Sequence, residues 1–262
     1  MKKAFFLTLF LIHLSLASQE ISTHLITKKE LFADKFIGVD DFQNLYFTKD
    51  NILYKKSSTK EFSYSNVNLG ELTSVKIQNP FKIILFYADF NSTVILDNNL
   101  NELTERIDFT KETLFNNVNY VTGASQNNLW LFPDDNKLHL YDYQTNTEVL
   151  QTQALTFYDE NFVPLNMVSS YKKVWIQGEK GVFEFNEYGV FLKNYPLEEI
   201  DFIFPFQKGF IYSIENSLYY HDLIKTTAIQ LKHKLSDQAI YINNSNIFIF
   251  ESNMVYEYQI IR

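Results

Sequence analysis

The sequence predicts an all-β protein built from six similar four-stranded units, and three observations support this prediction. Aromatic residues make up 17% of the chain, with 25 Phe and 17 Tyr, and such side chains suit half-buried pleated sheets. A strand–turn–strand pattern with a constant inner spacing recurs along the chain. Residues 18–262 are enough for one large β domain, and because the chain has no cysteine, its stability must come from a packed core rather than from disulfides.

The repeated pattern is clearest at residues 129–142, where an apolar strand, a polar turn and a second strand follow one another. Two apolar residues that lie eight positions apart mark the two strands of each copy. The six pairs are Leu45 and Leu53, Phe86 and Val94, Trp130 and Leu138, Val174 and Val182, Phe210 and Leu218, and Ile247 and Val255. Their first members lie 41, 44, 44, 36 and 37 residues apart, a period typical of propeller blades.

Further strands are expected on both sides of each hairpin. The expected first strands are 36–39, 72–77, 120–122, 165–168, 202–204 and 239–242, and the expected fourth strands are 61–64, 103–109, 148–150, 190–192 and 228–231. The last unit lacks a fourth strand, whereas residues 20–27 form a spare strand near the other end. Pairing the two ends would cover two exposed sheet edges. We therefore predict a six-bladed β-propeller that is closed by the N-terminal strand, with seven blades or an open sandwich as alternatives.

The hairpin turns are expected to depend on asparagine, because the chain has only seven glycines. Asparagine tolerates left-handed backbone conformations and caps its own turn. The residues two positions before the second marker of each copy are Asn51, Ser92, Asn136, Lys180, Asn216 and Asn253. The sequence therefore predicts tight hairpins with asparagine at the left-handed position in four of the six copies.

The first 17 residues are typical of a secretory signal peptide. Two lysines precede an apolar run at 4–16, and small residues at Ser15 and Ala17 form a cleavage site. A membrane anchor is the weaker alternative, because the 13-residue run spans only about 20 Å as a helix. We expect residues 1–17 to be removed, residues 18–262 to form a single propeller domain, and the protein to lie in the periplasm, with no direct membrane span.

The charge of the chain argues against some partners. Removal of residues 1–17 takes away two lysines and no acid, so the formal net charge changes from −8 to −10. Nucleic-acid binding requires a basic surface, and anionic lipid attracts polybasic segments. The sequence therefore favours neither nucleic acid nor an anionic membrane surface as a partner.

The sequence contains no pattern typical of catalysis, a metal site or a cofactor site. No two histidines of the mature chain have metal-ligand spacing, and Gly-x-Ser-x-Gly and glycine-rich phosphate loops do not occur. The carboxylate pairs at 40–41 and 134–135 are expected to cap turns. Residues 142–148 carry oxygen side chains at alternate positions, as calcium loops do, but a polar β-turn is the preferred interpretation. We therefore expect no catalytic residue, no metal ligand and no cofactor, and we expect that the protein is not an enzyme.

Aromatic residues in loops are the remaining functional candidates. Phe115, Phe162 and Phe206 are expected outside the strands, where burial requires either a partner or a loop that folds back. Exposed, clustered aromatic side chains mark interfaces, whereas loops often cover their own side chains. The sequence therefore leaves partner contact and local packing open for these three residues.

The four-strand period, the spare N-terminal strand and the signal peptide together resemble exported bacterial β-propellers of the YncE-like or quinoprotein-like kind. The Asn, Lys, Phe and Tyr content, with export and without cysteine, looks like proteins of Bacteroidota. In that group small propellers accompany outer-membrane machines, including type IX secretion. The resemblance implies a non-enzymatic protein–protein interaction subunit of an outer-membrane or protein-export assembly. The alternatives are a calcium-dependent, lactonase-like or ligand-binding propeller that uses its central channel, and a carbohydrate-binding propeller.

Trp130 tests the predicted register. If it occupies a core position of the third unit, the substitution Trp130→Ala should lower the free energy of unfolding by about 3–5 kcal/mol, because it leaves a cavity. Thermal or denaturant unfolding measures this change. A melting temperature close to that of the wild type would contradict the assigned register.

Overall fold

The computed structural model describes residues 20–111, 115, 117–170, 172–222, 224–235 and 239–261. The expected signal peptide at residues 1–17 lies outside these residues. Within the described part, the chain is all-β, with 24 strands and two short 3-10 helices, η1 (Ala88–Phe90) and η2 (Leu155–Phe157). The all-β class predicted from the sequence is therefore confirmed.

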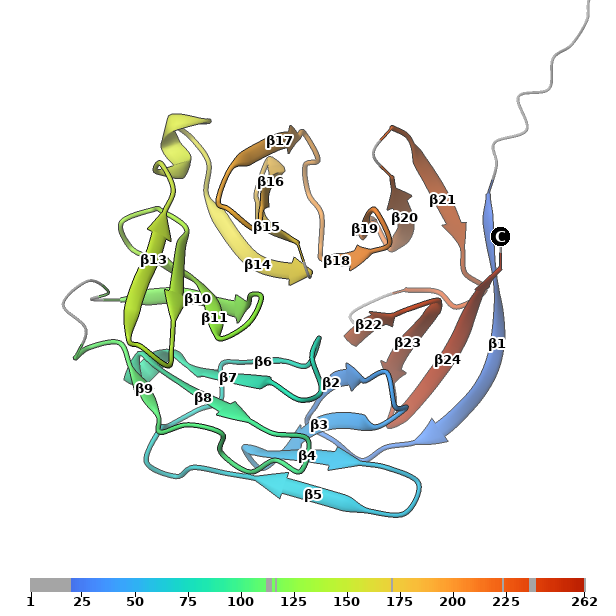
Figure 1. Ribbon diagram of the computed structural model, residues 1–262. Coiled ribbons are helices and arrows are strands. Elements are labelled where there is room, and N and C mark those ends of the chain that lie inside the picture. The colour runs from blue at the N-terminus through green and yellow to red at the C-terminus, as the bar shows by residue number, and fades with distance from the viewer. Residues whose placement is uncertain are drawn as a thin grey trace, which may run out of the picture.

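The strands form antiparallel sheets arranged around a common centre, as a β-propeller (Figure 1). Four of the sheets have four strands each. The first consists of β2 (Lys35–Val39), β3 (Leu45–Lys49), β4 (Ile52–Lys56) and β5 (Glu61–Tyr64), and the second of β6 (Ser74–Lys76), β7 (Ile83–Tyr87), β8 (Ser92–Leu96) and β9 (Ile107–Asp108). The third consists of β10 (Val118–Gly123), β11 (Asn128–Pro133), β12 (His139–Asp142) and β13 (Thr147–Gln151), and the fourth of β14 (Pro164–Ser170), β15 (Lys173–Gly178), β16 (Gly181–Asn186) and β17 (Phe191–Tyr195).

The remaining strands form one eight-stranded sheet. Its order is β18 (Ile203–Phe206), β19 (Gly209–Ile214), β20 (Ser217–His221), β21 (Thr226–Gln230), β1 (Ile21–Glu30), β24 (Met254–Ile261), β23 (Asn246–Glu251) and β22 (Ala239–Asn243). The N-terminal strand β1 runs antiparallel to β24 along most of its length. It also meets β21 in parallel through only two residue pairs, Ile21 with Ile229 and Ser22 with Gln230.

The repeat read from the sequence coincides with the second and third strands of each unit. All marker residues lie on these strands except Leu138, which directly precedes β12. Trp130 is buried, and it pairs with Thr122 on β10 and with Leu140 on β12. The expected fourth strand at 103–109 is largely wrong: only Ile107 and Asp108 form β9, because residues 103–105 bend away after an isolated bridge between Leu96 and Glu102.

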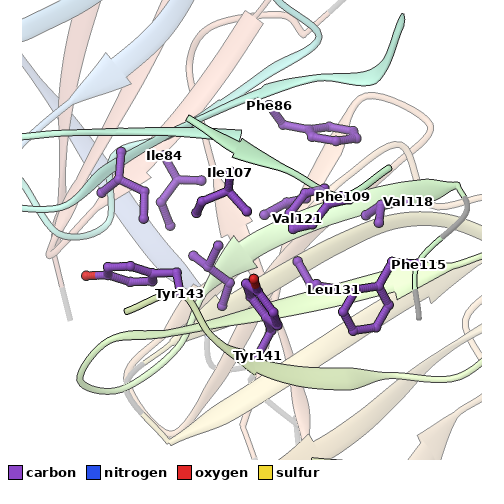
Figure 2. Close-up of a cluster of buried hydrophobic side chains, with 12 residues drawn as sticks. Ile84, Phe86, Ile107, Phe109, Phe115, Val118, Val121, Leu131, Tyr141 and Tyr143 are labelled. Carbon is purple, nitrogen blue, oxygen red and sulfur yellow. The ribbon is translucent and has the colours of Figure 1, made fainter. Parts of the chain in front are cut away.

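The core lies between neighbouring sheets. One cluster joins β7–β9 to β10–β12 and contains Phe86, Phe109, Leu131 and Tyr141 (Figure 2). A second cluster joins β10–β13 to β14–β17, and a third joins β14–β17 to β18 and β19. A fourth lies between the two halves of the eight-stranded sheet, and a fifth joins the first four-stranded sheet to the second. A further cluster joins the last strands to the first, with Phe248 and Val255 packed among Phe36, Val39 and Phe47. Each sheet therefore buries its apolar faces against both of its neighbours.

Asparagine supplies the left-handed turn positions, as the sequence predicts. Asn51, Asn136, Asn216 and Asn253 have φ between 59° and 64°. In the hairpin that carries Ser92, the left-handed residue is Asn91 instead, with φ of 42°. Short polar side chains therefore take the place of glycine in these hairpins.

Asn253 provides a direct test, because its side chain is exposed at the β23–β24 turn. The substitution Asn253→Ala should lower the free energy of unfolding by about 1–2 kcal/mol, since alanine disfavours the left-handed region. The matched variant Asn253→Gly should be close to neutral or slightly stabilising. Denaturant unfolding of the two variants measures the difference, and equal stability would contradict this account of the turn.

Candidate functional site

The ends of the innermost strands surround a cavity at one mouth of the central channel. Residues at or near the C-terminal ends of β2, β6, β14, β18 and β22 line it, and its volume is about 480 Å³. Figure 1 shows these strands around the centre of the molecule. We call this space the channel-mouth cavity. Small-molecule sites commonly have volumes of about 300–1,000 Å³, so the cavity is large enough for a ligand.

The lining of the channel-mouth cavity is rich in side-chain amides and hydroxyls. The polar residues are Asp40, Asp41, Gln78, Ser169, Ser170, Gln207, Asn243, Asn244 and Ser245. Asn243 donates from Nδ2 to the carbonyl of Val39, and Asn244 donates from Nδ2 to Asp41 Oδ1, each at 3.0 Å. These two bonds tie β22 and its turn to the end of β2.

Four of these side chains have donors and acceptors that other residues do not use. Within the described part of the chain, the side chains of Gln78, Ser170, Gln207 and Ser245 form no hydrogen bond with another residue, and all four residues are exposed. They come from four different turns or strand ends. Amide and hydroxyl groups can both donate and accept hydrogen bonds. The cavity therefore presents several uncommitted polar groups toward one space.

Asp40 is fully engaged in holding the cavity wall. Its Oδ1 accepts hydrogen bonds from the backbone N–H groups of Phe42 and Asn44, each at 2.9 Å, and its Oδ2 accepts one from the hydroxyl of Tyr46 at 3.0 Å. Lys55 Nζ lies 3.7 Å from Asp40 Oδ2. Burial raises the pKa of the Tyr46 hydroxyl, and the neighbouring Asp40 charge raises it further. The predicted turn-capping role of Asp40 is confirmed.

Aromatic rings form the deeper wall of the cavity. Phe204 and Tyr241 meet edge to face, with 5.5 Å between ring centroids. Tyr241 lies against Gly38, where a Cβ atom would come within 2.5 Å of the ring. Gly38 also has a φ of 153°, which L side chains rarely adopt. Glycine at this position is thus required for the close packing of β2 and β22.

An exposed aromatic pair stands beside the cavity. Phe42 and Phe81 meet edge to face at 5.7 Å, and more than half of each residue is exposed. Phe42 directly follows the cavity residue Asp41, and Phe81 belongs to the turn that supplies Gln78. We call these two residues the rim pair.

Sequence reasoning missed the rim pair, although a signal is present. Each ring follows a capping residue by two positions, with Phe42 N–H donating to Asp40 Oδ1 and Phe81 N–H donating to Asn79 Oδ1. Both turns connect the first and second strands of successive units. A Phe two residues after an Asp or Asn in equivalent turns could therefore have indicated a shared surface.

Two lysine amines near this end of the channel are held by backbone carbonyls of neighbouring sheets. Lys76, the last residue of β6, donates to the carbonyl of Met167 on β14 at 3.1 Å. Lys82 donates to the carbonyls of Ala124 and Gln126, each at 2.8 Å, and ties two sheets together. Burial lowers the pKa of each amine to about 8, with a smaller contribution from Lys35 at Lys76. Neither lysine lines the channel-mouth cavity.

The three loop phenylalanines expected from the sequence are buried within the chain. Phe115 is 0% exposed, Phe162 is 7% exposed and Phe206 is 5% exposed. Figure 2 shows Phe115 in the cluster that also contains Phe109 and Tyr141. Of the two readings left open by the sequence, local packing describes their positions, and Phe206 also belongs to the lining of the channel-mouth cavity.

The physical reason is that the neighbouring segments fold back over the sheets. Phe162 stacks on Phe183 with 3.9 Å between centroids, and this approach depends on Gly178, where a Cβ atom would lie 2.7 Å from the ring. Phe206 lies within β18 and meets Tyr220 edge to face at 5.2 Å. The three residues lie in different clusters rather than in one.

Exposed apolar side chains also occur on β13 and β17 and on the connections next to them, and the ribbons of these two strands lie on the outer side of the propeller (Figure 1). The exposed residues are Val149, Phe157, Tyr188, Val190 and Leu192, with Phe157 74% exposed and Tyr188 71% exposed. We call this set the outer apolar patch.

Contacts beneath the outer apolar patch connect its parts. Phe157 on η2 meets Tyr158 edge to face, and Tyr158 stacks on Phe191 at 4.2 Å. Phe191 lies between Val190 and Leu192 in the sequence, and Gly189 approaches Leu150, the neighbour of Val149. The connection between β13 and β14 therefore exposes the ring of Phe157, whereas its Phe162 is buried.

The structure also bears on the calcium-loop-like segment and on possible metal sites. Asp142 Oδ1 accepts the backbone N–H groups of Gln144 and Thr145, so the 142–148 segment is a capped turn. Among the described residues, no group of three or more His, Cys, Asp or Glu side chains is arranged to hold a metal ion. The described part of the chain also contains no helix that is long and apolar enough to cross a membrane.

No protein-family model and no curated protein matches the sequence, so the YncE-like and quinoprotein-like resemblance has no sequence-family support. Solved structures do match the fold. Virginiamycin B lyase from Staphylococcus aureus matches with a TM-score of 0.59 and 10% identity, covering 91% of this chain and all of the lyase chain. BamB from Moraxella catarrhalis matches with a TM-score of 0.54 and 9% identity over 90% of this chain and 97% of BamB.

PorZ, a bacterial surface component of the type-IX secretion system of Porphyromonas gingivalis, matches 88% of this chain with a TM-score of 0.53 and 12% identity. The match covers only 32% of PorZ. At these identities the likenesses establish the β-propeller fold alone.

The likeness to the lyase corrects one expectation from the sequence. The expectation that this protein is not an enzyme does not stand, because virginiamycin B lyase is an enzyme with the same fold. The missing catalytic patterns in the sequence were a weak basis for that expectation. Propellers bring catalytic side chains together from separate blades, so short sequence motifs do not mark them.

The two buried lysines predict a pH dependence of stability. In the unfolded chain a lysine amine keeps its proton up to about pH 10.5. In the folded protein the amines of Lys76 and Lys82 each lose the proton near pH 8. Between these values the unfolded state binds more protons, so raising the pH favours the folded state. The free energy of unfolding should therefore rise from pH 8 to pH 10. The rise should be smaller in Lys76→Met and smaller again in the double variant with Lys82→Met; an unchanged slope in Lys76→Met would contradict the assignment.

Proposed function

We propose that this chain is an exported β-propeller that acts as a protein-interaction subunit of an outer-membrane or protein-export assembly. The observation that carries the proposal is the outer apolar patch, in which Phe157, Tyr188 and three aliphatic residues are exposed on β13, β17 and the connections next to them. Contiguous exposed apolar side chains mark protein–protein contact sites, and aromatic residues contribute most to their binding energy. A protein partner with a complementary apolar surface would cover this patch.

The proposal includes export and a complete ring. The charged start, apolar run and small-residue exit at 1–17 favour removal of a signal peptide and a single domain at 18–262 in the periplasm. Six blades would result if β18–β21 formed one blade and β22–β24 with β1 formed another. Two features support this division: β1 meets β21 through only two residue pairs, and Phe248 and Val255 pack against the first sheet.

The comparison with PorZ supports a place in a secretion assembly. PorZ is a surface component of the type-IX secretion system, and a part of it has the same fold as this chain. The chain spans about a third of the length of PorZ, so the remaining parts of that protein have no counterpart in the match. The outer apolar patch gives this chain its own means of joining such an assembly.

Site-specific photo-crosslinking tests the proposal. A photoreactive phenylalanine analogue at Phe157 or Tyr188 should capture an outer-membrane or protein-export component from intact cells, identified by mass spectrometry. The same analogue at Phe32, which is exposed outside the patch, serves as the control. The substitutions Phe157→Ser and Tyr188→Ser should each weaken co-isolation by at least about tenfold, since aromatic residues at interface centres contribute about 2 kcal/mol or more.

Stability measurements separate loss of binding from unfolding. Both substituted side chains are exposed, so the melting temperatures of the variants should remain within a few degrees of the wild type. Recovery of the protein alone at native expression, or equal crosslinking from Phe32 and Phe157, would contradict the proposal.

A further inference from the structure

The channel-mouth cavity is distinct from the outer apolar patch and has a different chemistry. Its lining comes from the C-terminal ends of innermost strands, whereas the patch lies on the outer strands β13 and β17 and on η2. No residue of the patch lines the cavity. A function of the cavity therefore does not depend on the protein contact proposed above.

The polar groups of the cavity point to a hydroxyl-rich ligand. Gln78, Ser170, Gln207 and Ser245 offer donors and acceptors that no described side chain or backbone group uses. Drug-like ligands favour mostly apolar pockets with few polar groups, and this lining differs from that type. A ligand with many alternating donors and acceptors would satisfy these side chains, and sugar hydroxyls have this character.

The charges of the cavity disfavour an anionic ligand. Two carboxylates, Asp40 and Asp41, belong to the lining, and no lysine, arginine or histidine does. The nearby Lys82 amine is occupied by backbone carbonyls. Lys55 does not line the cavity, and its amine is committed to Asp40 Oδ2, at 3.7 Å, and to the carbonyl of Asn98, so an anionic group would meet the Asp41 carboxylate without a free cation. An uncharged ligand meets no electrostatic repulsion from these carboxylates, and its hydroxyls could donate hydrogen bonds to Asp41.

The rim pair adds the surface that sugar rings require. Phe42 and Phe81 are exposed aromatic rings in the two turns that supply Asp41 and Gln78. The apolar C–H faces of a pyranose ring pack on aromatic rings, while the equatorial hydroxyls remain free for polar side chains. The two turns are stiffened by their caps, because Asp40 and Asn79 hold the backbone N–H groups of Phe42 and Phe81. The platform is therefore pre-formed, which lowers the entropic cost of binding.

From these observations we propose that the channel-mouth cavity and the rim pair form a binding site for a neutral oligosaccharide. The sugar chain would lie with one ring stacked on the face of one phenylalanine of the rim pair and against the other, and with the next ring in the cavity, hydrogen-bonded to Gln78 and Gln207. A site of this kind would attach the propeller to an uncharged glycan while the outer patch remains free.

Titration of the purified protein with neutral trisaccharides tests the proposal. The probes are maltotriose, cellotriose and triacetylchitotriose, with the acidic 3′-sialyllactose as a charge control, and binding is followed by calorimetry and saturation-transfer NMR. We expect saturable binding of at least one neutral trisaccharide. We expect binding to 3′-sialyllactose to be at least tenfold weaker.

Variants locate the binding. The substitutions Phe42→Ala and Phe81→Ala should each weaken binding by about tenfold, because each removes a stacking surface. Gln78→Ala is the matched cavity variant: its side chain forms no hydrogen bond with the described chain, and its backbone is not left-handed. Phe157→Ala, in the outer patch, should leave sugar binding unchanged and thereby separates this proposal from the protein contact.

Three results would overturn the proposal. The first is no saturable binding of any neutral trisaccharide. The second is binding that persists unchanged in the double variant Phe42→Ala and Phe81→Ala. The third is equal binding of 3′-sialyllactose. Because all substituted side chains are exposed, circular dichroism and melting temperature should show that each variant is folded.

Discussion

The structure depends on apolar packing between neighbouring sheets. A single four-stranded sheet of this chain has two apolar faces and cannot cover them alone. The clusters around Phe86 and Leu131, around Trp130 and Phe183, and around Phe210 and Trp175 each lie between two sheets. Five such clusters occur among the described residues, and a sixth lies between the two halves of the eight-stranded sheet, so each sheet holds its neighbours in place. Without disulfides, this burial is the main source of stability.

Because packing between the sheets stabilises the fold, the side chains of the turns are not needed for the core. Left-handed asparagines close the hairpins, and carboxylates such as Asp40 and Asp142 accept the turn N–H groups. Because these short polar contacts are local, the side chains at the tips need not contribute to the core. Phe42, Phe81 and Phe157 are examples of exposed side chains in such segments. Exposed aromatic residues are thus concentrated on turns and short connections, where they can contact other molecules.

The two candidate surfaces differ in their chemistry as well as in their place. The outer apolar patch consists of aromatic and aliphatic side chains, which suit a protein surface. The channel-mouth cavity combines amides, hydroxyls and carboxylates with an aromatic rim. Lys76 and Lys82 serve the fold, since their amines hydrogen-bond to carbonyls of neighbouring sheets. One molecule could therefore bind two kinds of partner at once.

The sequence by itself determined the all-β class, the repeat and the hairpin turns. These features depend on local patterns: the alternation around Trp130, the eight-residue spacing, and an asparagine such as Asn216 at a left-handed turn. The pairing of β1 with β24 could also be anticipated, because a spare strand and a missing strand were visible at the two ends.

Only the tertiary structure decided which aromatic residues are exposed. Phe162 was a plausible contact residue, but its loop folds onto Phe183 through the space left by Gly178. Phe42 and Phe81 lie 39 positions apart and meet only because two sheets stand side by side. Exposure and convergence depend on contacts between distant segments, and a local pattern carries no information about them. The same reason explains why the channel-mouth cavity, assembled from five separate strand ends, could not be found in the sequence.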